Sequence, residues 1–239
     1  MQYNGMEVTI RKSPLPPGSD QREARGQVYA FVPAHGGSNT DKVARHLSRN
    51  LSEDYRLSVL LADFCSYGFP LWGKSEAPQR LDGRTWGAFL RSHDVFDTLE
   101  AREAHPRDIL RLLDHARGPY HVTCADISEA KESSALEVLR HADSIFLVTN
   151  SDRSSIDSAR YRTAWLRSMD LEDRSALLLH RVAGGVSGAE AEDRTGLPVC
   201  AAVDDHRELR LLSEWLAAPH IPHQAKPHQA KLIPIRRVG

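Results

Sequence analysis

Short apolar runs alternate along most of this chain with stretches in which apolar residues recur at helical spacing. The apolar runs predict strands at residues 27–32, 57–64, 121–127, 144–149, 175–182 and 197–203. The periodic stretches predict helices at residues 40–52, 106–116, 134–141, 154–169, 189–195 and 205–217. Residues 86–90 favour a short helix or a strand. Because strands that alternate with helices build parallel sheets, we expect an α/β fold with a doubly wound, mainly parallel sheet flanked by helices.

The two ends of the chain differ from this alternating middle. Residues 1–26 are rich in proline, glycine and charge, which predicts an extended N-terminal arm. Within it, residues 6–10 could add an edge strand or belong to a loose tail. A chain of 239 residues has room for one α/β domain, which we place at 27–217. Residues 218–239 predict a flexible C-terminal tail, because a Pro-His-Gln-Ala-Lys segment repeats there and its prolines prevent a continuous helix.

Two segments are candidates for contact with protein partners. The segment from Leu232 to Val238 could add a strand to another protein's sheet edge, or could be a disordered end. The aromatic loop from Tyr67 to Trp72 could form an exposed contact patch, or could fold over the edge of the chain's own sheet. This loop lies in a long stretch rich in glycine and proline, at 65–86, which is typical of functional or mobile loops.

Charge and cysteine content narrow the class of protein. The formal net charge is −1, from 31 basic and 32 acidic residues, so nothing indicates nucleic acid or a membrane surface as an obligate partner. Cys65, Cys124 and Cys200 lie far apart, and the last two fall in apolar runs, which favours buried thiols in a reducing compartment over a disulfide. No apolar run approaches the roughly 20 residues of a membrane span, and the first residues are polar. We therefore expect a cytoplasmic protein, which partners could recruit to the inner membrane.

A glycine turn separates the first predicted strand from the helix that follows it. The turn reads His-Gly-Gly-Ser-Asn over residues 35–39. Glycines allow a tight turn, and the backbone N–H groups at the start of the helix face an anion, which is the layout of a phosphate-binding loop. A working loop also needs a lysine for the phosphates and a hydroxyl for Mg²⁺. Those two positions hold Thr40 and Asp41.

Further short signatures follow in order. One apolar strand ends at Asp63 and another at Asp126; residues 142–149 read Ala-Asp-Ser-Ile-Phe-Leu-Val-Thr, and residues 195–199 read Thr-Gly-Leu-Pro-Val. Together with the glycine turn, these segments resemble the MinD/ParA family of P-loop ATPases, especially its pilus-assembly branch, the CpaE and TadZ proteins. The resemblance covers about residues 27–217. It implies a nucleotide site at the glycine turn, a Mg²⁺-side acid at Asp126, and dimers that form face to face across nucleotide.

The departures from the family pattern fall where the chemistry would occur. His35 lies where the family's signature lysine reaches the partner's phosphates, and Asn39 replaces the third glycine. Thr40 replaces the phosphate lysine, and Asp41 replaces the hydroxyl that holds Mg²⁺. A carboxylate about 4 Å from one phosphate charge costs roughly 4 kcal/mol at an effective dielectric constant of about 20. Cys65 replaces the second acid of the family's Asp-x-Asp pair, so most of the charge stabilisation for phosphoryl transfer is missing.

The predicted strand at 175–182 contains two neighbouring polar residues, His180 and Arg181. His180 replaces the family's adenine-reading asparagine. Arg181, with Asp204 and Asp205, could form an ion-pair cluster or a polar pocket for a base. The degenerate nucleotide site would consist of Gly36, Gly37, Ser38, Asn39, Thr40, Asp41, Asp63, Asp126, His180 and Arg181.

The combination predicts a pseudo-ATPase that serves as a scaffold, localisation or assembly factor for a bacterial envelope machine, such as a pilus, secretion or exopolysaccharide system. We expect no catalytic residues, no resident metal and no obligatory cofactor, and a homodimer or a heterodimer with a family relative. One alternative is an atypical ATPase that binds ATP and Mg²⁺ and slowly hydrolyses the nucleotide as a dimer. Another is an accessory protein related to the tyrosine kinases of capsule export, although the tyrosine cluster of those kinases is absent from this tail.

Overall fold

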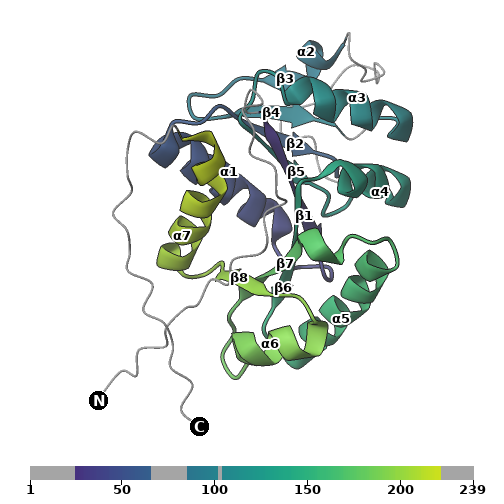
Figure 1. Ribbon diagram of the computed structural model, residues 1–239, viewed down its shortest axis with the longest axis vertical. Helices are drawn as coiled ribbons and strands as arrows, with labels where there is room; N and C mark the ends of the chain where they lie inside the picture. The colour runs from purple at the N-terminus through teal and green to yellow at the C-terminus, as the bar shows by residue number, and fades with distance from the viewer. Residues whose placement is uncertain (1–24, 66–84, 102–103, 222–239) are drawn as a thin grey trace.

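The computed structural model describes residues 25–65, 85–101 and 104–221. Its centre is an eight-stranded sheet in the order β3-β4-β2-β5-β1-β6-β7-β8. All neighbouring strands are parallel except β3 and β4, which pair antiparallel at one edge. The strands are β1 Gln27–Pro33, β2 Val59–Asp63, β3 Leu90–Arg91, β4 Asp97–Glu100, β5 Val122–Asp126, β6 Ser144–Asn150, β7 Ser175–His180 and β8 Val199–Ala202. The expected doubly wound, mainly parallel α/β fold is therefore confirmed (Figure 1).

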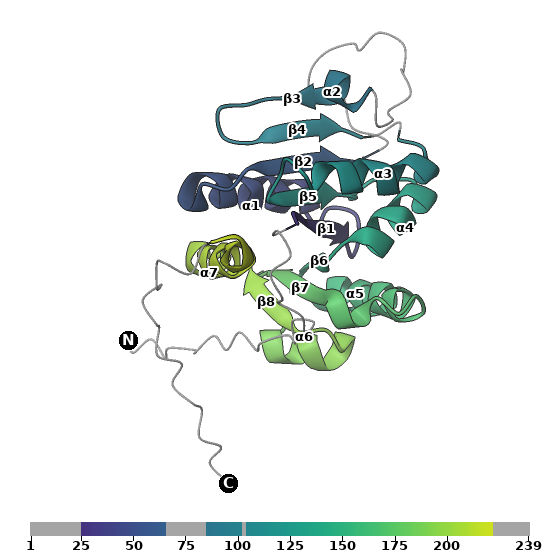
Figure 2. The same cartoon turned by 45° about the horizontal axis from the view of Figure 1, so that its top comes forward.

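Helices cover both faces of the sheet (Figure 2). The helices are α1 Thr40–Tyr55, α2 Trp86–Phe89, α3 Pro106–Ala116, α4 Glu132–His141, α5 Arg153–Arg167, α6 Gly188–Thr195 and α7 His206–Ala217, with short 3₁₀ turns at Glu172–Arg174 and Ala218–His220. Helices α1 and α7 pack on one face, and α3, α4 and α5 pack on the other. Two hydrophobic cores result, one on each side of the sheet. In the part of the chain that the structure describes, no helix combines the length and apolar character needed to cross a membrane.

Burial explains why the central strands are so apolar. Strand β1 pairs with β5 on one side and with β6 on the other, and its five middle residues are buried. Strand β5 is buried along its whole length. A strand that is covered by helices on both faces loses the alternation of apolar and polar residues, as the sequence of β1 shows. β1 is therefore an inner strand, and the glycine turn that follows it lies at the carboxyl ends of the central strands.

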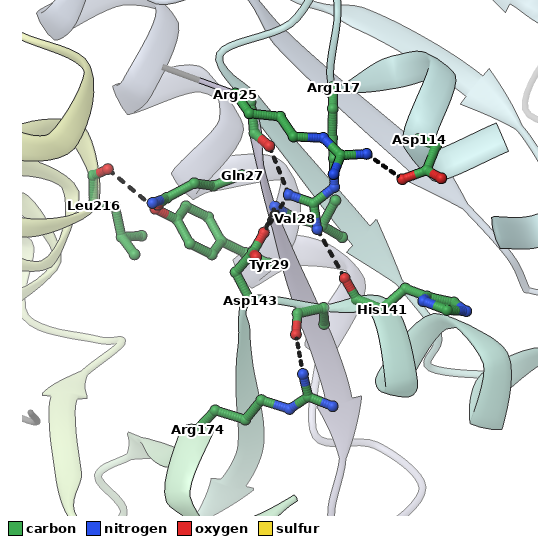
Figure 3. Close-up of polar contacts among 12 residues, drawn as sticks. Arg25, Gln27, Val28, Tyr29, Asp114, Arg117, His141, Asp143, Arg174 and Leu216 are labelled. Atoms are coloured by element: carbon green, nitrogen blue, oxygen red, sulfur yellow. Dashed lines mark hydrogen bonds and ion pairs between the residues drawn. The ribbon is translucent and has the colours of Figure 1, made fainter. Parts of the chain in front are cut away.

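At the amino ends of the strands, opposite the glycine turn, the Arg117 side chain links several elements (Figure 3). The Arg117 guanidinium donates to the Gly26 carbonyl at 2.7 Å, to the His141 carbonyl at 2.9 Å and to the Asp143 carboxylate at 2.6 Å. Asp143 also accepts a hydrogen bond from the Val28 backbone N–H at 2.7 Å. These contacts join the start of β1 to the ends of α3 and α4. They fix the position of β1, and with it the turn at the far end of that strand.

The cysteines partly match the expectation. All three thiols are free, and Cys124 is fully buried. Cys200 is only partly enclosed, because β8 is the last strand at its edge of the sheet. The possible edge strand at 6–10, the aromatic loop at 67–72 and the docking segment at 232–238 lie outside the described residues.

Candidate functional site

The carboxyl ends of β1, β2 and β5 meet beside the glycine turn. Asp63 and Asp126 are the last residues of β2 and β5, and they are paired in the parallel register. The backbone N–H of Phe64 donates to the Asp126 carbonyl at 2.9 Å, so the pairing continues past the last strand residues. In open α/β sheets this edge is where ligands bind. The structure thus brings two of the predicted site residues together.

Both strand ends are followed by the same tight turn. The Asp63 carboxylate accepts a hydrogen bond from the Cys65 backbone N–H at 2.9 Å. The Asp126 carboxylate accepts one from the Ser128 backbone N–H, also at 2.9 Å. The Cys65 Sγ and Ser128 Oγ atoms lie 3.0 Å apart as a result. Ser128 was missed by sequence reasoning, although the Asp-x-Ser spacing repeats the Asp-x-Cys spacing and could have revealed it.

Burial and negative charge both change the pKa values of Asp126 and Cys65. Asp126 is only 5% exposed, and burial raises the pKa of its carboxyl to about 6. This value also includes the hydrogen bonds from Ser128, which lower the pKa, and the nearby carboxylates of Asp63 and Asp41, which raise it. The pKa of the Cys65 thiol is also raised, well above its usual range. Burial is the main cause, and the carboxylates of Asp126 and Asp63 add to it. Among the described residues, the charged groups that act on Asp126 and Cys65 are therefore acidic.

The glycine turn combines exposed and buried positions. Gly36, Gly37 and Asn39 are exposed, whereas Ser38 and Thr40 are buried, and the hydroxyls of these two are hydrogen-bonded to each other at 2.7 Å. Gly37, at φ +85°, and Asn39, at φ 52°, adopt the left-handed conformation. A Cβ on Gly36 would meet nothing within 4 Å, so the space outside this glycine is open. The Thr40 hydroxyl is engaged inside the turn.

His180 and Arg181 occupy different surroundings. His180 is the last residue of β7 and lies near the glycine turn, since the backbone of Ser38 acts on the pKa of its ring. Burial lowers the pKa of His180, and its Nε2 atom is buried without a hydrogen-bond partner in the described part of the chain. Arg181 forms ion pairs with Asp205 at 3.7 Å and with Glu208, and its backbone N–H donates to Asp204 at 3.0 Å. Of the two arrangements that the sequence left open for Arg181, the structure has the ion-pair cluster.

A hollow of about 380 Å³ lies on the α4–α5 side of the same edge. Val32, Ile127 and Leu139 contribute apolar walls, and Arg162 and Trp165 contribute polar and aromatic ones. The Arg162 guanidinium lies 5.2 Å from the centre of the Trp165 ring. Its lining comes from several separate elements, so no local sequence pattern marks it.

Comparison with known proteins gives structural neighbours only. No family model and no curated protein sequence matches the chain. A ParA family ATPase from Chlorobium tepidum superimposes with a TM-score of 0.63 at 18% identity, covering 80% of this chain and 92% of that one. The septum site-determining protein MinD from Pyrococcus horikoshii, complexed with Mg-ADP, gives 0.60 at 18% identity, covering 79% and 86%. The MinC:MinD cell division complex of Aquifex aeolicus gives 0.62 at 17% identity, covering 82% and 89%.

This chain has the fold of the MinD and ParA ATPases. At these identities the likeness extends to the fold and no further. The glycine turn of the chain follows β1 and precedes α1, as the resemblance in sequence implies. What the turn binds has to be argued from its own residues.

Proposed function

We propose that this protein is a pseudo-ATPase of the MinD/ParA type, close to the CpaE and TadZ branch, which acts through protein contacts as a scaffold or assembly factor for a bacterial envelope machine. The observation that carries the proposal is the pair Thr40 and Asp41 at the end of the glycine turn. Asp63 and Asp126 are acids that a magnesium-dependent ATPase would also have, but Asp41 adds a further negative charge that acts on Asp126. Phosphoryl transfer instead needs a lysine and a metal-binding hydroxyl at this turn, to stabilise the charge of the triphosphate.

The loop residues are a poor fit for a magnesium-bound triphosphate. Thr40 stands at the lysine position, and its hydroxyl is hydrogen-bonded to Ser38. Asp41 stands at the hydroxyl position and adds negative charge to the group that contains Asp126. Gly36 and Gly37 leave open space outside the turn, which supports contact with a ligand or a partner chain but supplies no charge.

The proposed partners are proteins. MinD from Aquifex aeolicus is found in a complex with MinC, so a protein with this fold can present a surface to another protein. The loop from Tyr67 to Trp72 and the tail segment from Leu232 to Val238 are the proposed contact regions. Because His35 stands in place of the bridging lysine, a homodimer or a heterodimer with a relative would form without nucleotide. Deletion of residues 222–239 followed by affinity capture tests the tail, and an unchanged set of partners would count against its role.

Calorimetry with the purified chain, ATP and Mg²⁺ tests the central claim. We expect no heat of binding for the wild type. The double variant Thr40→Lys/Asp41→Thr restores the lysine and the hydroxyl, so a gain of binding by this variant would show that these two positions are what the loop lacks. Micromolar binding by the wild type would overturn the proposal.

An atypical ATPase is the second candidate, and the open space outside Gly36 and the retained Asp63 and Asp126 favour it. ATP should then change the oligomeric state of the protein, and Asp126→Ala should abolish that change. An accessory role in polysaccharide export is compatible with the scaffold proposal and would appear in the identity of captured partners.

A further inference from the structure

Three potential metal ligands converge where β2 and β5 end. One carboxylate oxygen each from Asp63 and Asp126 and the Cys65 sulfur all lie within 4.8 Å of one another. The side chains come from two different strands, and the parallel register of β2 and β5 brings them together. The two turns described above hold Cys65 beside Ser128, whose hydroxyl lies 3.0 Å from the sulfur. This arrangement is a mixed set of oxygen and sulfur donors.

The distances suit a small divalent cation after slight closure. Zinc bonds to sulfur at about 2.3 Å and to carboxylate oxygen at about 2.0–2.2 Å, so tetrahedral ligands lie roughly 3.4–3.8 Å apart. Because the three donors lie within 4.8 Å of one another, each pair needs to close by at most about 1.4 Å to reach this spacing. The Ser128 hydroxyl or a water could complete the coordination.

A second observation comes from the burial of Asp126. Its side chain is almost entirely buried, and its hydrogen bonds come from Ser128. Among the described residues, no basic side chain forms an ion pair with it, and the charges that act on it belong to Asp63 and Asp41. A buried carboxylate normally has a positive partner or a metal. In the part of the chain that the structure describes, Asp126 therefore has acidic but no basic charged neighbours, and the donors beside it are of the type that binds metals.

We propose that Asp63, Cys65 and Asp126 bind a divalent cation of the zinc class directly, without nucleotide. On binding, the Cys65 thiol releases its proton to solvent and the thiolate bonds to the metal. Thiolate is a ligand for zinc and similar metals, whereas Mg²⁺ takes oxygen ligands and keeps several waters. The site therefore differs from a magnesium ion held through nucleotide phosphates. The inference goes beyond the proposed function, because it requires neither nucleotide binding nor its loss.

Cobalt titration of the full-length, chelator-treated protein tests the proposal. A Co²⁺–thiolate bond gives a charge-transfer band in the near ultraviolet, and histidine or carboxylate ligands do not give this band. We expect the band to saturate at one equivalent of Co²⁺ and to be displaced by Zn²⁺ but not by excess Mg²⁺. Cys65→Ser should abolish the band, and Cys200→Ser, which changes a partly enclosed thiol on β8, should retain it. Asp63→Asn and Asp126→Asn should each weaken Co²⁺ binding by about tenfold or more.

Absence of the band in the wild type, or its persistence in Cys65→Ser, would overturn the proposal. X-ray absorption of the zinc-loaded wild type gives a second measurement that needs no variant. We expect one sulfur among the zinc ligands, and a shell of nitrogen and oxygen alone would also overturn the proposal. Histidines elsewhere in the chain could bind zinc but would not add sulfur. Failure of this test leaves the calorimetric result with ATP unaffected, so the two proposals fail separately.

Discussion

At the scale of single residues, Asp126 gives the clearest dependence on pH. Its pKa in the folded protein is about 6, above the ordinary value of 3.8, chiefly because the carboxyl is buried. Between these two values the folded state holds the proton more tightly than the unfolded state does. The free energy of unfolding in chelator should therefore fall as the pH rises from about 4 to 6, by at most roughly 3 kcal/mol from this group.

Asp126→Asn isolates this effect, because the amide keeps the size of the side chain and removes its charge. We expect the variant to be more stable than the wild type at pH 7, and the difference to shrink as the pH falls through the same window. Urea denaturation of both proteins at several pH values, with chelator present, measures the difference. A constant difference between pH 4 and 7 would contradict the assigned titration.

Asp152 illustrates a local prediction that needs no knowledge of the fold. Its carboxylate caps α5, accepting from the Ser155 N–H at 2.9 Å and from the hydroxyls of Ser154 and Ser155 at 2.6 Å. These hydrogen bonds hold the pKa of Asp152 far below its usual range. Asp152→Ala should lower the free energy of unfolding at pH 7 by about 1 kcal/mol, whereas Asp152→Asn should lose less because the amide can still accept. Equal losses in thermal and urea denaturation would argue against capping.

The contrast between Asp152 and the acidic cluster shows what the sequence can reveal. A cap depends on residues three positions apart, so the sequence offers Ser151 or Asp152 as the cap of the helix predicted at 154–169 and starts the last helix at Asp205. In the structure Asp152 and Asp205 are the capping residues. Asp63 and Asp126 were recognisable as strand ends, but their pairing depends on the strand order. The 3.0 Å approach of Cys65 to Ser128 follows from that order and from two turns. It could not be inferred from either segment alone.

At the scale of elements, the buried helices and strands were predictable, most of their exact ends were not, and one strand beside the sheet edge was missed altogether. The helix at 106–116 was predicted to the residue, because a proline marks its start and apolar residues its inner face. Strand β4 was missed because only Leu99 of its residues is buried, so no apolar run marks it. Helix α1 runs to Tyr55, beyond the predicted residue 52, and ends at Arg56 in a left-handed conformation that usually calls for glycine.

Gly26 tests how tightly β1 is held at its start. Its backbone N–H donates to the Arg117 carbonyl at 3.1 Å, and a Cβ at Gly26 would lie 2.0 Å from the Tyr120 carbonyl oxygen. Backbone atoms of the connection between α3 and β5 would have to move, so Gly26→Ala should lower the free energy of unfolding by more than about 2 kcal/mol. Gly36→Ala is the matched control, since its Cβ would meet nothing within 4 Å. Similar urea midpoints for the two variants would contradict this account of the strand start.

At the scale of the whole molecule, the residues that determine the fold differ from the residues that determine the chemistry at the carboxyl ends of the strands. The strand order and the two cores depend on apolar residues spread over all the central strands. The carboxyl edge depends on a few polar positions, which can change without disturbing either core. The chain therefore keeps the arrangement of MinD and ParA ATPases while it places acids and a thiol beside its glycine turn. Apolar periodicity predicted the mainly parallel α/β class, the strand order came only from the structure, and the altered chemistry stays a prediction from the residue types at the turn.

The oligomeric state tests whether the chain keeps the fold without nucleotide-dependent chemistry. If dimers form through protein surfaces alone, Mg²⁺ and ATP should leave the sedimentation profile of the full-length chain unchanged across a range of protein concentrations. The proposed function places His35 and Thr40 at the family's two lysine positions, so under it neither residue would supply a positive charge to a nucleotide between two copies. Asp126→Ala should behave as the wild type does in this measurement. An ATP-dependent increase in dimer that Asp126→Ala abolishes would instead establish an atypical ATPase, since only a nucleotide held at this edge could make dimerisation depend on that carboxylate.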